Sequence, residues 1–280
     1  MAKIGELYRL VQVLSLDVVA GALASTLFIA QYLNVTLPLS VLITLGAAVW
    51  VIYTTDHLLD AKSIQHKAHT LRHRFHQEHS KKLTWAVAVV GIIGAVGVYF
   101  LPVVTIQYGL TLTIVVGLYF LVLKLTGGNL LMFKEVSIAT IYTLGIFLGP
   151  FSLAHDFSDT GLWLLLTEYL LLAYINLLEF SLYDASSDAQ DQQRSAVSAV
   201  GKSKIYWMIT LLFVLLFTCM SVGVFYWLSN APLFVASQWV ILLMTLGLLA
   251  VLIFRKQLER RQYYRILGDA VFLFPIIGLF

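Results

Sequence analysis

Charged side chains are scarce in this sequence. Asp, Glu, Lys and Arg make up 12% of the 280 residues, and apolar residues make up 60%. A soluble domain carries about a quarter of charged residues, so the composition excludes an ordinary soluble protein. The apolar residues occur in long blocks, and a block of about 20 residues is enough for a helix that spans a bilayer. The sequence therefore predicts an all-α polytopic membrane protein.

Cysteine is nearly absent, because Cys219 is the only one and it lies in an apolar block. A single cysteine excludes an intramolecular disulfide, and we interpret Cys219 as a packing residue. The polar start "MAKIGELYRL" is followed by an apolar run that is longer than the core of a cleaved signal peptide. We therefore expect the first apolar block to stay in the protein as a membrane helix.

The apolar blocks predict nine transmembrane helices within one membrane domain, residues 1–280. In chain order the predicted helices cover residues 10–33, 37–60, 83–101, 103–125, 134–154, 161–185, 205–229, 236–255 and 263–280. The connections on one side are predicted to be short, and those on the other side are longer.

Lys and Arg are missing from every second connection between these helices. All 18 of them lie in or beside residues 1–9, 61–82, 126–133, 186–204 and 256–262. Because Lys and Arg concentrate on the cytoplasmic side, we expect a cytoplasmic N-terminus and an outside C-terminus in the cell (inner) membrane. The net charge of +3 then reflects orientation and contact with membrane lipid. Nucleic-acid binding is not expected, since it requires a basic patch on a polar domain.

Pairs of aspartates end two of the predicted helices. Asp56 and Asp60 lie four residues apart at the end of the second helix, and Asp184 and Asp188 have the same spacing at the end of the sixth. Asp191 follows three residues later. Residues at i, i+4 and i+7 share one helix face. The predicted topology places both clusters at the cytoplasmic side of the membrane.

Like charges at this spacing destabilise a helix, and ionisable groups near a membrane mark functional sites by default. A hard divalent cation relieves the repulsion. Mg²⁺ prefers oxygen ligands and is commonly held by one or two carboxylates together with substrate phosphates. The two clusters therefore predict a Mg²⁺-bridged diphosphate between two helices. The alternative interpretation is that both clusters are merely solvated helix ends.

At these residues the chain resembles the UbiA superfamily of intramembrane prenyltransferases. The resemblance is most specific at "DHLLD" and "YDASSD", and the segments "TLRHRF" and "YFLVLK" add to it. Members of the superfamily have nine helices, with aspartate-rich motifs on the second and the sixth. Tyr53 stands where the first motif has Asn, and Ser181 stands where the second motif has its first Asp.

The resemblance implies a UbiA-like helical bundle. The implied reaction is the Mg²⁺-dependent transfer of an isoprenyl group from a prenyl diphosphate to a hydrophobic acceptor, either aromatic or lipid-like. The implied catalytic carboxylates, which also bind the metal, are Asp56, Asp60, Asp184 and Asp188, with Asp191 as a further metal ligand. A terpene cyclase of the same fold, a polytopic transporter and a catalytically inactive member are the alternatives.

Cationic side chains on the cytoplasmic side are predicted to bind the diphosphate, because a guanidinium matches phosphate oxygens in a bidentate way. The alternative is that they contact only lipid headgroups. The predicted diphosphate-binding residues are Arg72, Arg74, Lys124 and Lys134. Tyr53, Tyr183 and Asn176 complete the predicted substrate-binding set. Asn176 lies two turns before Asp184, deeper along its helix, where an acceptor would sit.

Six of the seven histidines lie between His57 and His79. Zinc binding is conceivable, since histidine is a common metal ligand. However, no cysteine is nearby, and spacings of three residues match no zinc-finger pattern. We expect instead a short polar helix from His66 to His79 at the membrane interface, covering the site, with Phe75 facing the membrane. Asp17, Glu179 and Asp269 are expected to form hydrogen bonds between helices.

Overall fold

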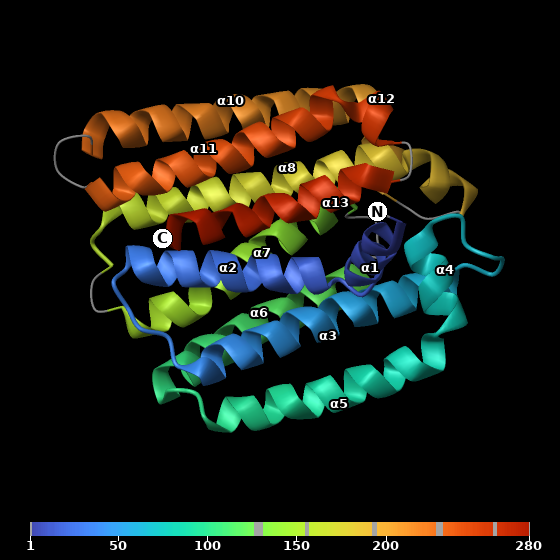
Figure 1. Cartoon of the computed structure of the whole chain (residues 1–280), viewed down its shortest axis with the longest axis horizontal. Coiled ribbons are helices and arrows are strands. Elements are labelled where there is room, and N and C mark those ends of the chain that lie inside the picture. Colours follow the sequence, from blue (N-terminus) through green and yellow to red (C-terminus); the bar gives the residue numbers. More distant parts are fainter. Residues whose placement is uncertain are drawn as a thin grey trace.

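The computed structural model describes residues 2–125, 131–154, 157–191, 195–227, 232–259 and 262–279. Within these ranges the chain is almost entirely helical, and the long helices run side by side along the longest axis of the molecule (Figure 1). The predicted all-α architecture is therefore confirmed.

The first half of the chain contributes six helices. They are α1 (Ala2–Val13), α2 (Leu16–Tyr32), α3 (Leu39–Ser63), α4 (Leu71–Glu78), α5 (Ser80–Tyr99) and α6 (Val103–Leu125). The second half continues with α7 (Leu131–Leu153), α8 (Thr160–Gln190), α9 (Ala196–Val200), α10 (Lys202–Trp227), α11 (Pro232–Ile253), α12 (Arg255–Leu258), α13 (Tyr263–Ala270) and a 3-10 helix, η2 (Val271–Leu279).

Six of the described helices are long and apolar enough to cross a membrane: α3, α5, α7, α8, α10 and α11. The predicted first span is shorter than expected because Ser15, with a φ of 54°, separates α1 from α2. The predicted last span is divided into α13 and η2, and η2 contains Pro275, which has no N–H to donate. The described residues confirm a helical membrane protein, while the count of nine spans stays a prediction.

Helix α8 is the centre of the bundle. It packs against α7, α10 and α11, and its residues Leu165, Tyr169, Leu172 and Ile175 are fully buried. Helix α2 packs against α3, α7 and η2. Helix α5, by contrast, lies on the outside of α3 and exposes large apolar side chains such as Trp85. An exposed apolar helix face of this kind is what contact with lipid requires.

The short helices α4, α9 and α12 all lie at one end of the bundle (Figure 1). Helix α4 carries the histidine-rich segment, but it begins only at Leu71, where the Thr70 hydroxyl caps it by accepting a hydrogen bond from the His73 backbone N–H at 3.3 Å. The expected polar helix is therefore present but shorter, because His66 and His69 precede it. The ring of Phe75 stacks on His79, with 4.2 Å between the ring centroids.

Candidate functional site

The carboxylate of Asp184 is held by two side chains from α13. The Tyr264 hydroxyl donates to one carboxylate oxygen, and the Arg265 guanidinium forms an ion pair with the other. Asp184 is only 8% exposed, and a buried charge requires a partner of this kind. The pairing with Arg265 explains how a negative charge is accommodated at the end of the apolar helix α8.

Asp188 lies one turn further along α8. Ser195 forms a side-chain hydrogen bond with it, and the positive charges of Arg265 and Arg72 act on it. Burial and the repulsion from Asp184 outweigh these attractions and raise the pKa of Asp188 to about 7. In the second aspartate pair, Arg265 of α13 is in direct contact with Asp184, and the charges of Arg265 and Arg72 act on Asp188.

The first aspartate pair is more accessible. The side chain of Asp56 is 53% exposed, and the neighbouring His57 is buried with both ring nitrogens lacking a hydrogen-bond partner among the described residues. Asp60 lies one turn further along α3, and the charges of Lys134 and Arg72 act on it. The repulsion between Asp56 and Asp60 that the sequence predicts is present as well.

Arg72 on α4 links the two pairs, since its charge acts on Asp60 of the first pair and on Asp184 and Asp188 of the second. Burial and the nearby positive charge of Arg265 lower the pKa of Arg72, whereas Asp184 opposes this change. The charge of Arg265 is therefore unfavourable for the charged form of Arg72, although Arg265 itself is paired with Asp184. Such a pair of arginines is suited to an additional anion, because an anion would relieve the repulsion.

Two predicted substrate-binding residues have structural partners instead. Arg74 donates from Nε and Nη2 to the Ala68 carbonyl at 3.2 and 3.1 Å. The Tyr183 hydroxyl donates to the Val251 carbonyl at 2.6 Å, and its ring stacks on Tyr264 with 4.0 Å between centroids. Arg74 thus fixes the loop before α4, and Tyr183 ties α8 to α11 and α13.

Two lysines, Lys124 and Lys134, are predicted to bind the diphosphate. The charge of Lys134 on α7 acts on Asp60 of the first aspartate pair. The backbone of Lys124 belongs to α6, but its side chain lies outside the described residues. Of the two lysines, only Lys134 can be placed at the carboxylates.

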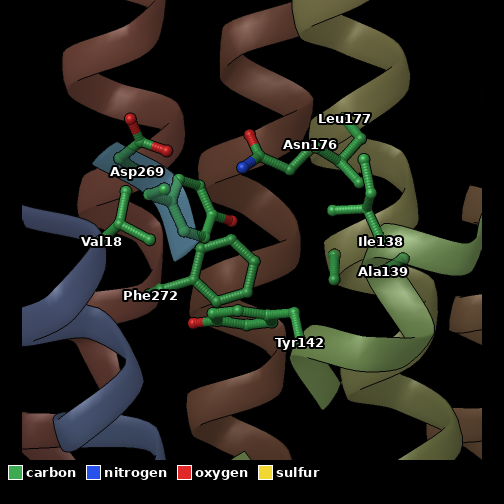
Figure 2. Close-up of a pocket in the computed structure, with 10 residues that line it drawn as sticks. Val18, Ile138, Ala139, Tyr142, Asn176, Leu177, Asp269 and Phe272 are labelled. Carbon is green, nitrogen blue, oxygen red and sulfur yellow. The ribbon is translucent and has the colours of Figure 1, made fainter. Parts of the chain in front are cut away.

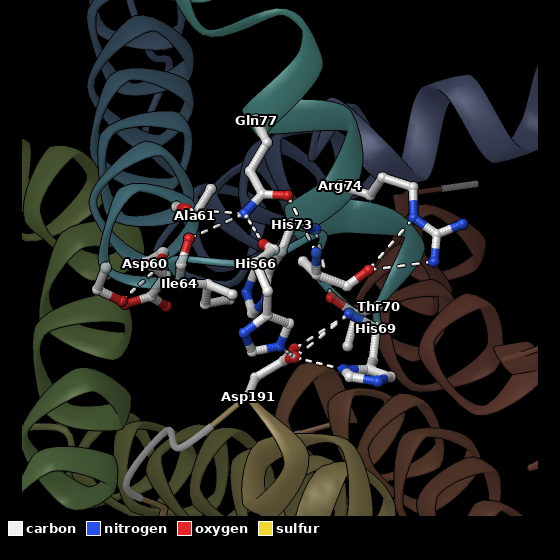
Figure 3. Close-up of polar contacts among 12 residues, drawn as sticks. Asp60, Ala61, Ile64, His66, His69, Thr70, His73, Arg74, Gln77 and Asp191 are labelled. Carbon is white, nitrogen blue, oxygen red and sulfur yellow. Dashed lines mark hydrogen bonds and ion pairs between the residues drawn. The ribbon is translucent and has the colours of Figure 1, made fainter.

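Asp191, predicted as a fifth metal ligand, lies at the C-terminal end of α8 and contacts histidines (Figure 3). Its Oδ1 is 3.0 Å from His66 Nε2 and 2.5 Å from His69 Nδ1. The His69 backbone N–H also donates to the carboxylate, at 3.2 Å to Oδ2. Burial alone would raise the pKa of Asp191, but these hydrogen bonds outweigh burial and lower it.

A small cavity lies in the bundle, between α2, α3, α7, α8, α13 and η2 (Figure 2). Its polar lining comes from Tyr53, Tyr142, Asn176 and Asp269, and the amide of Asn176 points toward Asp269 (Figure 2). Its volume is about 30 Å³, which is room for about one water molecule. A prenyl chain or an aromatic acceptor would therefore have to displace side chains such as Phe272 to enter it.

No family model, curated protein or solved structure matches this chain. The assignment of a function therefore depends on the geometry of the site itself.

Tyr264 and Arg265 belong to the site, although no motif in the sequence points to them. Both lie in the last predicted span, and Arg265 stands one helical turn before Asp269. The signal that could have identified Arg265 is the presence of an arginine within an apolar segment. Ionisable groups inside a membrane segment face the protein interior and pair with one another.

Proposed function

We propose that this protein is a Mg²⁺-dependent intramembrane prenyltransferase with a UbiA-like bundle. It would transfer an isoprenyl group from a prenyl diphosphate to a hydrophobic acceptor, aromatic or lipid-like. The observation that carries the proposal is that Arg265, which is buried, and Arg72, which is partly buried, each have a buried Nε without a hydrogen-bond partner among the described residues. The charges of both arginines also act on Asp188 of α8. Arg72 also acts on Asp60 of α3.

Both arginines have spare hydrogen-bonding capacity. The Nε atoms of Arg72 and Arg265 are buried and have no hydrogen-bond partner within the described part of the chain. Leaving a buried donor unpaired costs about 1–3 kcal/mol, and more for a charged group. A diphosphate would satisfy these donors and would neutralise the repulsion between the two guanidinium groups. The arginines are therefore the proposed binding groups for the diphosphate.

Only some of the predicted aspartates are available to bind Mg²⁺. Asp184 already holds Tyr264 and Arg265, so in this arrangement it positions Arg265. Asp56, Asp60 and Asp188 offer the hard oxygen ligands that Mg²⁺ prefers, and the half-exposed Asp56 can be reached from outside the bundle. When bound, Mg²⁺ would neutralise the charge that develops on the leaving diphosphate. We leave Asp191 out of this set, because its carboxylate contacts His66 and His69.

The apolar interior of the bundle would hold the isoprenyl chain and the acceptor while the isoprenyl group is transferred. As the bond between the allylic carbon and the diphosphate oxygen breaks, its electron pair leaves with the diphosphate. The acceptor then supplies the electron pair of the new bond and loses a proton. Arg72 and Arg265 stabilise the departing charge, and the helices keep water from the allylic cation. Asn176 and Asp269 are the polar groups that would orient the acceptor.

We further propose nine membrane spans with the N-terminus in the cytoplasm and the C-terminus outside the cell membrane. The Lys and Arg distribution supports this orientation, and the gathering of α4, α9 and α12 at one end of the bundle agrees with it (Figure 1). The aspartates and arginines of the proposed site would then face the cytoplasm.

The proposal is tested by pyrophosphate release from farnesyl and geranylgeranyl diphosphate, using the full-length protein in detergent with added membrane lipid. We expect release that depends on Mg²⁺ and falls by at least about 100-fold in Arg72→Gln and Arg265→Gln, as for loss of one charge-stabilising donor. Arg9→Gln is the matched control, because Arg9 is exposed on α1. Release that is equal in all three variants would exclude the proposed role of the arginines. A cyclised hydrocarbon as the product would indicate the terpene cyclase alternative.

A second candidate function is ion-coupled transport. It is favoured by Glu179 on α8, which is fully buried and has no hydrogen-bond partner for either carboxylate oxygen within the described residues. Glu168, earlier in α8, receives a hydrogen bond from Gln238 at 2.9 Å. Buried carboxyl groups of this kind occur in the proton relays of transporters. Proton uptake into vesicles that is lost in Glu179→Gln, without any pyrophosphate release, would support transport over prenyl transfer.

A further inference from the structure

A second cluster of potential metal ligands lies outside the proposed prenyl diphosphate site. It consists of His66 and His69, in the segment between α3 and α4, and Asp191 at the end of α8 (Figure 3). Their ligand atoms, His66 Nε2, His69 Nδ1 and one Asp191 oxygen, all lie within 4.8 Å of one another. The Asp191 side chain is 1% exposed, whereas the two imidazoles are 48% and 47% exposed. The cluster is thus anchored on the carboxylate and open to solvent on the histidine side.

The segment that carries the histidines is held by Gln77 of α4 (Figure 3). Its Nε2 donates to the carbonyls of Ala61, Ile64 and His66, at 3.2, 3.2 and 2.9 Å. Its Oε1 accepts a hydrogen bond from the Ala68 backbone N–H at 3.0 Å. One amide group therefore sets the path of the chain on both sides of His66.

Two further contacts fix the same segment. Arg74 donates to the Ala68 carbonyl, and the His69 backbone N–H donates to the Asp191 carboxylate. Metal ligands in proteins are oriented by outer hydrogen bonds of this kind, and removing those bonds weakens metal affinity by about 10–100-fold. The two histidines and the aspartate are thus held near one another by a built support. A chance meeting of flexible side chains would lack such a support.

We propose that His66, His69 and Asp191 bind a divalent transition metal ion, with Zn²⁺ as the reference ion. Two imidazole nitrogens and one carboxylate suit zinc and its neighbours in the first transition row. Zinc lies about 2.0–2.2 Å from such ligands, and the two imidazoles, about half exposed, are free of tight packing that would prevent them from turning toward one ion. Three protein ligands leave a fourth position for water.

The site differs from the proposed Mg²⁺ site in its ligands, although both include groups near the C-terminal end of α8. Mg²⁺ prefers oxygen ligands, whereas two of the three ligands here are nitrogens. Bound zinc would join the segment before α4 to the end of α8. His69 and Asp191, which belong to these two parts, lie 122 residues apart in the sequence. The same segment leads directly into α4 and Arg72, so the bound zinc would also fix the position of that arginine.

The test is a Zn²⁺ titration of the metal-stripped, full-length protein in detergent by isothermal calorimetry, with Mg²⁺ as the comparison ion. We expect one Zn²⁺ per chain and no comparable binding of Mg²⁺ at this site. His66→Gln, His69→Gln and Asp191→Asn should each weaken Zn²⁺ binding by at least about tenfold, in line with the effect of losing even an outer support of a metal ligand. His79→Gln is the matched control, because His79 stacks on Phe75 in α4 and should leave the affinity unchanged.

X-ray absorption of the zinc-loaded unmutated protein removes the dependence on variants that fail to fold. Two imidazole ligands in the zinc shell would support the site. A shell without imidazole would overturn it, and so would any of the three ligand variants binding Zn²⁺ as tightly as the unmutated chain. Neither result would affect the Mg²⁺-dependent prenyl transfer, since that proposal is tested by pyrophosphate release in Arg72 and Arg265 variants.

Discussion

Arg265 on α13 forms an ion pair with Asp184 on α8, although the two residues lie 81 positions apart in the sequence. Both side chains are buried, with exposures of 6% for Arg265 and 11% for Asp184. The pair connects the last helical segment of the chain to the central helix of the bundle. It also brings a positive charge to the end of α8, where the sequence shows only aspartates.

Breaking this pair should destabilise the protein. Arg265→Met keeps an unbranched apolar stem, although a shorter side chain, and leaves the buried Asp184 charge without its cation, which costs on the order of 3–5 kcal/mol. The double variant Arg265→Met/Asp184→Asn should lose less than the sum of the two single variants, because the neutral amide needs no cation. Denaturant unfolding in detergent micelles measures both quantities. Additive losses would mean that the two side chains do not interact.

Gly268 should tolerate no side chain. A Cβ at this position would lie 2.6 Å from Phe180 Cε1 and 2.7 Å from Asn176 Oδ1. Gly268→Ala should therefore cost about 1–3 kcal/mol, as for an overpacked core, and it should displace Asn176 from the cavity. At Gly145 of α7 a Cβ would meet nothing within 4 Å, so Gly145→Ala should be neutral or stabilise by up to about 1 kcal/mol. Equal melting temperatures for the two variants would contradict the described packing.

Acid should destabilise the fold partly through His73. Burial, followed by the charges of Arg72 and Arg265, lowers the pKa of His73 to about 4, against about 6.5 for an ordinary histidine. The unfolded chain therefore binds the proton more readily than the folded protein. The stability from neutral His73 is complete above about pH 6.5 and is lost as the pH falls toward 4, a loss on the order of 3 kcal/mol.

His73→Gln should flatten this part of the pH dependence, because glutamine does not titrate in that range. Melting temperatures of the two proteins, recorded in detergent between these pH limits, give the comparison. If the variant loses stability with the same slope as the unmutated chain, His73 is not the group responsible.

Mg²⁺ and a prenyl diphosphate should stabilise the protein together by more than either does alone. A ligand that binds only the folded state contributes about 2.7 kcal/mol at a hundredfold excess over its dissociation constant. The diphosphate oxygens would complete the metal shell, and Arg72 and Arg265 would bind the same group. Thermal melting of four samples tests this: the protein alone, with Mg²⁺, with farnesyl diphosphate, and with both. A combined sample that melts no higher than the better single addition argues against a shared site, and Asp188→Asn should abolish the extra stabilisation.

The two ends of the chain should lie on opposite sides of the membrane. Alternate connections lack Lys and Arg, and the nine proposed spans would carry the chain across the membrane an odd number of times. A reporter that is active only in the cytoplasm should work when it is fused before residue 1 and should be silent when it is fused after Phe280. Activity from both fusions would exclude an odd number of spans.

Several features of the protein follow from the sequence alone. Long apolar blocks predict membrane helices, because about 20 consecutive apolar residues are enough for a helix to span a bilayer and this depends only on local composition. The spacing of Asp56 with Asp60 and of Asp184 with Asp188 places each pair on one face, since helical periodicity is also local. The polar segment before α5 indicates a short helix for the same reason, although its start at Leu71 depends on the Thr70 cap.

Only the tertiary structure decided which partner each charge meets. Asp184 is paired with Arg265, and Asp191 meets His66 and His69, across separations of 81 to 125 residues. Asp184 and Asp191 are seven residues apart in one helix and look equivalent in the sequence. They differ because α13 packs beside the first of them and the segment before α4 packs beside the second. Helical periodicity places a side chain on a face of its own helix, whereas the group that faces it is set by how distant helices pack.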